Sequence, residues 1–131
     1  MFSKIMYTTL FVTDQDKALD FYTTMFGFEK RVDYPGPEGR FLTIAFKGQT
    51  LEVILWPGVA EPASETPRSP TDGIPGTLFI ESDNLRKDFE ELKLRGVNFG
   101  DAEPEDYAFG VRVEALDPDG NRISLRQRRQ Q

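Results

Sequence analysis

The chain has 131 residues, of which 38% are hydrophobic and 29% charged, values typical of one soluble globular domain. It contains no Cys and no His, which excludes disulfides and Cys- or His-based metal sites and removes the usual general base near neutral pH. The net charge is −6, and such a surface repels nucleic acid and anionic lipid. The apolar run at residues 5–12 is too short to span a membrane. We therefore expect a cytoplasmic protein that binds neither nucleic acid nor membrane.

The first part of the chain predicts a strand, a helix and three further strands. The first strand ends at Val12, and the helix runs from Asp14, which can cap free N–H groups, to Gly27, which favours the conformation that ends a helix. One apolar face recurs at helical spacing through Ala18, Phe21, Tyr22 and Met25. Strands are then expected over residues 28–34, 40–46 and 50–56, with a hairpin turn at residues 47–49.

The last part of the chain repeats this order of elements. A strand through residues 78–80 precedes a helix from Asp83 to Gly96, the same 13-residue step as from Asp14 to Gly27. Its apolar face is Leu85, Phe89 and Leu92. A weak strand from Val97 and strands over 109–115 and 122–127 follow, the last two joined by a turn at 117–121. The basic cluster at residues 126–129 is interpreted as a solvated terminus.

A proline-rich stretch separates the two repeats. Residues 57–76 hold five of the nine prolines, which predicts an extended connector. Such a length is unusual for a loop inside a compact domain and favours a lid or a crossover. The expected organisation is a single domain with a first module at 1–56, the connector at 57–76 and a second module at 77–131.

Alternation along the strands assigns a more polar face to each predicted sheet, opposite the helices. This face carries Tyr7, Phe11, Glu52, Ile54, Thr77, Phe79 and Ser124. A mostly apolar wall with a few polar groups is typical of a small-molecule pocket. The same pattern also fits a half-solvated sheet, and patterning alone leaves both interpretations open.

Two motifs resemble those of a known superfamily. The run from Phe11 to Tyr22, followed by Phe26-Gly27-Phe28, resembles the opening of glyoxalase and bleomycin-resistance proteins, which belong to the vicinal oxygen chelate superfamily. The run from Asp117 to Leu125 resembles their closing signature. The resemblance implies an α+β fold in which two βαβββ modules with curled mixed sheets form an open cup, with helices on the outer face. It also implies that a homodimer completes the cup.

Metal-dependent members of that superfamily use up to four ligands, and the resemblance places them at Tyr7, Glu52, Thr77 and Ser124. Only Glu52 is a residue type that those members use at its position. Transition metals prefer imidazole, thiolate or several carboxylates, so we expect no metal and no other cofactor. Metal-dependent isomerisation, extradiol cleavage and fosfomycin opening become improbable. The Asp117-Pro118-Asp119-Gly120 run lacks the spacing of a calcium loop and fits a hairpin turn.

Three functions remain after this exclusion. The first is binding of a small organic molecule at the dimer interface, where the acidic balance suits a cation and Tyr7, Phe11, Phe79 and Tyr107 suit stacking. The second is a divergent lyase-, isomerase- or dioxygenase-type enzyme with Glu52 as general base. The third is a vestigial regulatory module. Glu52 could instead be a solvated strand carboxylate or the partner of an arginine, for which the candidates are Arg40, Arg112 and Arg122.

Overall fold

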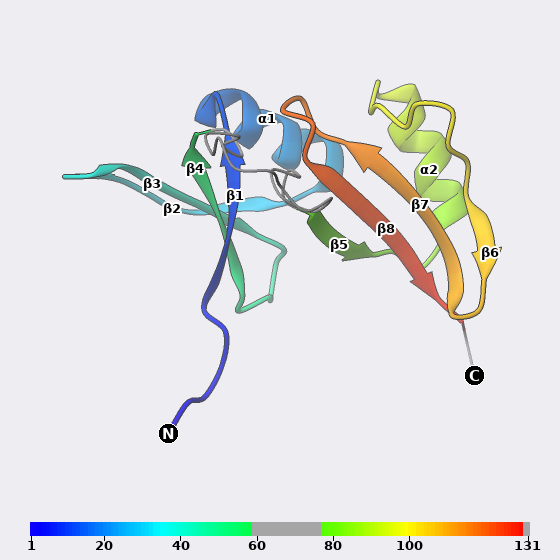
Figure 1. The fold of residues 1–131 in the computed structure, drawn as a ribbon, viewed down its shortest axis with the longest axis horizontal. Coiled ribbons are helices and arrows are strands. Elements are labelled where there is room, and N and C mark those ends of the chain that lie inside the picture. The colour runs from blue at the N-terminus through cyan, green and yellow to red at the C-terminus, as the bar shows by residue number, and fades with distance from the viewer. Residues whose placement is uncertain (59–76, 130–131) are drawn as a thin grey trace, which may run out of the picture. The chain divides into compact units, whose positions relative to one another are not determined.

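The computed structural model describes residues 1–58 and 77–129. Contacts within the chain divide it into two compact units, Met1–Gly76 and Thr77–Gln131. The described residues of each unit form one helix and one four-stranded sheet (Figure 1). Of the predicted connector only Pro57 and Gly58 belong to the described residues, and Pro57 is the last residue of a strand.

The first unit has the predicted order of one strand, one helix and three strands. Its elements are β1 (Tyr7–Val12), α1 (Gln15–Phe26), β2 (Glu29–Gly36), β3 (Gly39–Ala45) and β4 (Glu52–Pro57). The sheet order is β1-β4-β3-β2, with β1 parallel to β4 and the other pairs antiparallel. The predicted turn at 47–49 closes through a 2.9 Å bond from the Gln49 N–H to the Phe46 carbonyl.

Helix α1 begins and ends where its sequence predicts. The Asp14 carboxylate accepts from the Lys17 N–H at 3.0 Å, and Gly27 adopts a left-handed conformation with φ of 81°. Ala18 and Tyr22 are buried, whereas Phe21 and Met25 are only partly covered. The strands bury their predicted apolar faces, which form the core of this unit: Leu10, Val12, Leu42, Ile44, Val53 and Leu55.

A helix side chain links two strands whose own pairing is short. Strands β3 and β4 share only two register pairs, Thr43 with Ile54 and Ile44 with Val53. The side-chain amide of Gln15 donates to the backbone carbonyls of Arg40 and Leu55, both at 2.9 Å. This amide therefore connects α1 to both strands at their other end.

The second unit repeats the architecture. Its elements are β5 (Thr77–Glu81), α2 (Leu85–Leu94), β6 (Glu105–Tyr107), β7 (Gly110–Leu116) and β8 (Arg122–Arg128). The sheet order is β5-β8-β7-β6, with β5 parallel to β8 and the other pairs antiparallel. The core combines the predicted face of α2 with strand residues: Leu85, Phe89, Leu92, Val97, Phe99, Val113, Ala115, Ile123 and Leu125.

Helix α2 begins one residue later than predicted. Asn84, rather than Asp83, caps it by accepting from the Lys87 N–H at 3.3 Å. Ser82 fixes this start because its hydroxyl accepts from the Asn84 N–H and lies 2.6 Å from the Asp88 carboxylate. The side-chain oxygen of Gln127 in β8 accepts from the first helical N–H, that of Leu85, at 2.7 Å. At the other end, Gly96 has φ of 94° as predicted for a C-terminal glycine.

The predicted strand from Val97 is wrong. Only a single bridge forms there, between Asn98 and Leu116, and strand β6 of the second module lies at Glu105–Tyr107 instead. The reason is a turn in which the Ala102 N–H donates to the Phe99 carbonyl and Gly100 has a positive φ. Val97 and Phe99 are nevertheless buried. Their apolar pattern therefore indicates packing in the core and not pairing in a β-sheet.

The closing turn is a hydrogen-bonded loop centred on one carboxylate. Asp117 is 5% exposed and accepts from the N–H groups of Asp119 and Asn121, each at 2.8 Å, and from the Asn121 side chain at 3.0 Å. Gly120 has φ of 82°, a value that its lack of a side chain permits. The predicted turn is therefore confirmed.

The predicted fold class is confirmed as α+β with two βαβββ modules, each forming a four-stranded mixed sheet. Within the described residues, neither helix is long and apolar enough to cross a membrane.

Candidate functional site

The predicted site residues of the first module share one sheet face. Tyr7 and Glu52 are register partners in the parallel pair β1–β4, and Phe11 pairs with Trp56 in the same ladder. Ile54 lies two residues beyond Glu52 and is partly covered. Tyr7 is 38% and Phe11 44% exposed, and the Tyr7 ring packs edge-on against Phe41. The alternation of the strands thus brings these four side chains to one surface.

Glu52 is held by a threonine that sequence reasoning did not identify. The fully buried Thr43 hydroxyl donates to Glu52 Oε1 at 2.6 Å. The Thr43 oxygen in turn accepts from the Val32 N–H at 3.0 Å, so its hydrogen is directed to the carboxylate. A buried donor fixes the rotamer of Glu52, while among the described residues no other side chain bonds the carboxylate.

None of the three arginines considered as partners pairs with Glu52. Arg112 pairs with Glu105 and Arg122 with Glu114. Arg40 forms a two-pronged bond to Asp33 at 2.8 and 2.9 Å. These hydrogen bonds lower the pKa of Asp33 from 3.8 to about 2, and they raise the pKa of Arg40. The carboxylate of Glu52 is therefore not neutralised by an arginine within the described chain.

The three predicted residues of the second module have different environments. Phe79 and Ser124 are register partners in β5–β8, and Thr77 pairs with Arg122. Phe79 is 67% exposed, whereas Ser124 is fully buried. Thr77 is exposed. Phe79 lines a cavity, which the described residues of this unit form.

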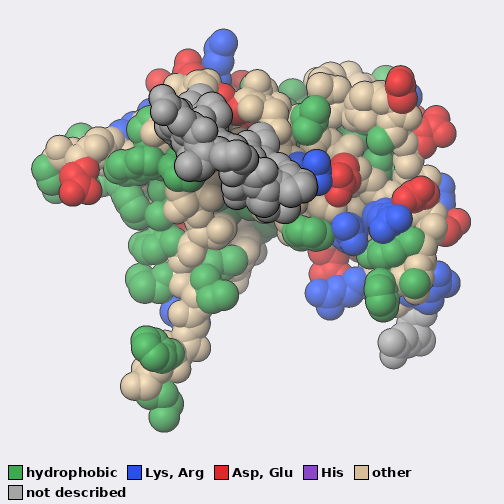
Figure 2. Space-filling model, in the orientation of Figure 1, with side chains coloured by type: hydrophobic (Ala, Val, Ile, Leu, Met, Phe, Trp, Pro, Cys, Tyr) green, Lys and Arg blue, Asp and Glu red, His purple; other side chains and the backbone are tan. Residues whose placement is uncertain are grey.

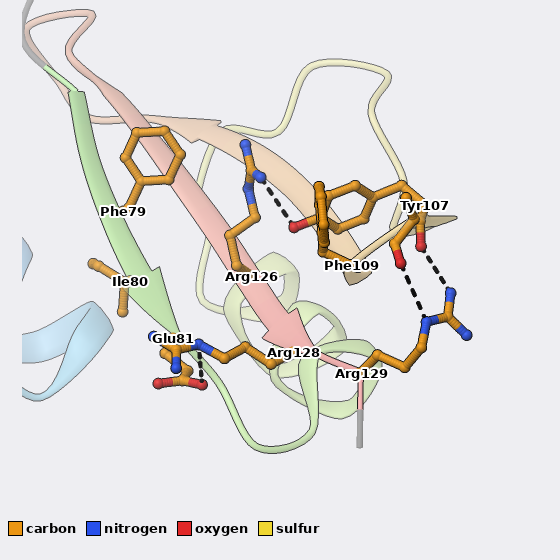
Figure 3. Close-up of a pocket in the computed structure, with 9 residues that line it drawn as sticks. Phe79, Ile80, Glu81, Tyr107, Phe109, Arg126, Arg128 and Arg129 are labelled. Carbon is orange, nitrogen blue, oxygen red and sulfur yellow. Dashed lines mark hydrogen bonds and ion pairs between the residues drawn. The ribbon is translucent and has the colours of Figure 1, made fainter. Parts of the chain in front are cut away.

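Arg126 in β8 occupies the centre of this face (Figure 3). Its Nε donates to the Ser124 hydroxyl at 2.8 Å, and its Nη1 donates to the Tyr107 hydroxyl at 3.1 Å. The guanidinium carbon lies 4.9 Å from the centre of the Phe79 ring and 5.3 Å from that of Tyr107. Two aromatic rings from opposite edges of the sheet thus flank one cation.

A cavity of about 560 Å³ opens beside this arrangement. Its lining comes entirely from the second unit: Phe79, Ile80, Glu81, Tyr107, Ala108, Phe109, Arg126, Arg128 and Arg129. The space-filling view shows basic and hydrophobic side chains together on this part of the unit (Figure 2). The volume suits a small organic ligand.

Arg126 also borders a second cavity, of about 450 Å³. Carboxylates dominate its lining, with Glu103, Glu105 and Glu114 beside Arg112. The two cavities therefore differ in charge although they share one residue.

Sequence reasoning missed Arg126 because it assigned residues 126–129 to a solvated terminus. Arg126 is half-buried inside β8, so that interpretation is wrong for this residue. The available signal was alternation, since Arg126 follows Ser124 by two residues and must share its face. Phe109, which is 73% exposed in the turn between β6 and β7, was missed because it was assigned to a strand.

The four residues at which the resemblance implies metal ligands do not fit a metal. The Ser124 oxygen already accepts from a guanidinium, and a cation so close disfavours a second positive charge. Among the described residues, no group of three Asp, Glu, His or Cys side chains could hold a metal ion. Thr77 and Tyr7 add only neutral oxygens.

Comparisons with known proteins agree with the fold. An uncharacterised protein of Bacillus subtilis (strain 168), YetH, is 30% identical over 97% of this chain and 100% of its own length. A lactoylglutathione lyase of Neisseria meningitidis is 31% identical over 96% of this chain and 91% of its own length. The crystal structure of TnmS3, an antibiotic-binding protein from Streptomyces sp. CB03234, superposes with a TM-score of 0.80 at 31% identity and covers 98% of both chains.

The match extends to a whole protein family. Residues 4–125 match the family described as the Glyoxalase/Bleomycin resistance protein/Dioxygenase superfamily. Both sequence motifs that carried the resemblance, residues 11–28 and 117–125, lie within this range. The chain therefore belongs to the glyoxalase/bleomycin resistance protein/dioxygenase superfamily.

Proposed function

We propose that this protein binds a small organic molecule without a metal ion, on the concave sheet face that carries Arg126. The observation behind the proposal is the cavity of about 560 Å³, which combines exposed aromatic rings with a fixed guanidinium. Rings supply stacking area, and a few oriented polar groups supply specificity. The antibiotic-binding relative TnmS3 supports the same class of function.

The predicted homodimer is part of this proposal. Residues Met1, Phe2, Ile5 and Met6 are all more than half exposed, and β1 is an edge strand of its sheet. An apolar segment next to an open edge favours coverage by another chain. Light scattering at micromolar concentration is expected to give twice the monomer mass, and a strictly monomeric species would contradict this part.

The binding function can be tested by thermal shift followed by calorimetry. Aromatic antibiotics and simpler aromatic compounds are screened with and without EDTA, and each hit is titrated into wild type and Phe79→Ala. We expect binding that is insensitive to EDTA and weakened at least about tenfold in Phe79→Ala, since burying an aromatic ring contributes a few kcal/mol. Leu94→Ala is the matched control because Leu94 is 88% exposed and absent from the cavity lining.

Enzymatic activity is the second candidate because one observation favours it. The resemblance implies that Glu52 stands at a carboxylate position of the superfamily, Thr43 orients it, and none of the arginines among the described residues pairs with it. A lactoylglutathione lyase is among the relatives. Formation of lactoylglutathione by the metal-free protein, lost in Glu52→Gln, would favour this candidate over simple binding. No formation above the uncatalysed rate would remove it.

A further inference from the structure

The cavity of about 560 Å³ that Phe79, Phe109 and Arg126 line is called the Arg126 cavity below. We infer that its ligand is an anion with a planar aromatic ring, such as an aromatic carboxylate, and that Arg126 binds the negative charge of this ligand. This inference rests on the proposed binding function and specifies the ligand class of the same site. It follows from the charges, the free hydrogen-bond donors and the exposed rings of the cavity.

The cavity lining is locally basic. It contains three arginines and one glutamate, a net charge of +2. That glutamate, Glu81, lies 3.2 Å from Arg128 and is therefore already paired. Arg129 donates to the backbone carbonyls of Tyr107 and Ala108 and forms no ion pair within the described residues.

Among residues 1–58 and 77–129, Arg126 has no carboxylate partner although carboxylates are near. The three glutamates of this sheet face each pair with a different arginine, as Glu81–Arg128, Glu105–Arg112 and Glu114–Arg122. Within that part of the chain, Arg126 donates its hydrogen bonds to two neutral hydroxyls, those of Ser124 and Tyr107. A half-buried cation with only neutral partners favours an anionic ligand, because that ligand would supply the missing charge.

The guanidinium also keeps donors for such a ligand. Arginine has five N–H groups, and the bonds to Ser124 and Tyr107 use one on Nε and one on Nη1. Three N–H groups therefore remain on Nη1 and Nη2, enough for a two-pronged bond to a carboxylate. Phe79 and Tyr107 hold the guanidinium on both sides, so little side-chain entropy is lost on binding.

The rings around the cavity define the rest of the ligand. Phe79 is 67% and Phe109 73% exposed, and the Phe109 ring lies edge-on to Tyr107 at 5.8 Å. Exposed rings at the border of a cavity offer faces for stacking of a planar molecule. The expected ligand thus places its ring against these side chains and its carboxylate against Arg126.

The overall charge of the chain argues for a cation, but the local charges have the larger effect. The net charge of −6 is spread over the whole surface. At physiological salt, charges beyond about 8 Å are largely screened, whereas Arg126 would contact the ligand directly. The ligand at this cavity is therefore selected by the arginines of its lining.

The test uses three probes of equal shape, 2-naphthoate, 2-naphthalenemethanol and 2-naphthylmethylammonium, titrated by calorimetry into the full chain at low salt. We expect the naphthoate to bind at least about tenfold more tightly than the neutral alcohol, because a charged hydrogen bond adds about 1.5–3 kcal/mol. The ammonium compound should bind most weakly. Added salt should reduce the preference for the naphthoate.

Variants separate a specific role of Arg126 from general charge. Arg126→Gln should abolish the preference for the naphthoate. Arg126→Lys keeps the charge but lacks the planar guanidinium that binds a carboxylate through two N–H groups, so it should retain only part of the preference. Arg122→Gln is the matched control, since Arg122 lies on the same face but not in the cavity lining. Circular dichroism should show that all three variants remain folded.

The outcomes distinguish the two levels of the proposal. Equal or tighter binding of the alcohol or the ammonium compound, with loss of affinity in Phe79→Ala, would overturn the anionic ligand class and leave the binding function intact. An unchanged preference in Arg126→Gln would also overturn it. Absence of binding for all three probes up to about 1 mM, and for every compound of the thermal-shift screen, would overturn both.

Discussion

The Thr43 hydroxyl lies 2.6 Å from Glu52 Oε1, and this bond joins a fully buried residue of β3 to a carboxylate of β4. The Thr43 hydroxyl accepts a hydrogen bond from the Val32 N–H and donates one to the Glu52 carboxylate. The geometry of Glu52 thus depends on a neighbour that has no charge of its own.

Thr43→Val should therefore cost more stability than Glu52→Gln. Valine keeps the shape but leaves the Val32 N–H and Glu52 without a partner, at about 1–3 kcal/mol. The glutamine in Glu52→Gln keeps an oxygen that accepts from Thr43, and we expect a change under about 1 kcal/mol. Urea unfolding measures both, with the exposed Thr50→Val as control. Equal losses in the two variants would contradict a role for the hydroxyl.

Protonation of Asp33, which breaks its ion pair with Arg40, should lower the free energy of unfolding in acid. Its pKa falls from 3.8 to about 2 in the folded state, so its contribution is present above pH 4 and is lost as the pH falls toward 2. Chemical unfolding at several pH values should show wild type and Asp33→Asn differing most above pH 4 and converging near pH 2. Asp101→Asn, which removes an exposed carboxyl, serves as control. A difference that is constant from pH 6 to pH 2 would exclude this linkage.

Gly110 should not tolerate a side chain. Its φ is 145°, and a Cβ there would overlap the Gln127 carbonyl oxygen and approach the Arg129 nitrogen to 2.9 Å. Gly110→Ala should lower the unfolding free energy by about 2–4 kcal/mol and weaken any binding at the cavity, because β7 and β8 must separate there. Gly39→Ala has a comparable backbone strain, since Gly39 has φ of 136°, but its Cβ would meet no atom closer than 3.6 Å, and about 1–2 kcal/mol is expected. Similar losses in both would show that strain alone, and not the close approach, decides the outcome.

Purified protein should contain no stoichiometric transition metal. Ser124 accepts from Arg126, and Thr77 and Tyr7 are weak ligands, so only Glu52 offers a charged donor. Elemental analysis is expected to find far less than one equivalent of zinc, nickel or iron per chain, and EDTA should leave the melting temperature unchanged. One equivalent that survives dialysis would contradict the prediction.

Most of the fold could be predicted because local signals agree with the packing. Asp14 and Gly27 bound α1 as predicted, and the alternation of Val53 and Leu55 against Glu52 and Ile54 matches the observed burial, whereas Leu51 is only partly covered. The prediction of a strand at Val97 was wrong because an apolar pattern does not distinguish a residue paired in a β-sheet from one packed in the core. Asp83 is not the cap because the Ser82 hydroxyl accepts from the Asn84 N–H, and Asn84 then accepts from the Lys87 N–H.

The candidate site was harder to predict than the fold. Phe79 was identified from alternation, and so was the face shared by Tyr7 and Glu52. Arg126 was not, because a run of arginines near a terminus has the composition of a solvated tail whether or not one of them is covered. Its role depends on Tyr107, 19 residues away in the chain, and no local pattern reports that contact.

The two glutamines at the helix–strand junctions use opposite ends of the same amide. Gln15 contributes its NH₂ group to two strand carbonyls, whereas Gln127 contributes its oxygen to the first N–H of α2. Deamidation, which replaces the NH₂ group by a negatively charged oxygen, would therefore affect the modules differently. At residue 15 it would set a carboxylate against two carbonyl oxygens and open the junction, and at residue 127 it would keep the acceptor and add a charge that a helix N-terminus favours. Chemical ageing of this chain should thus damage the first module and spare the second.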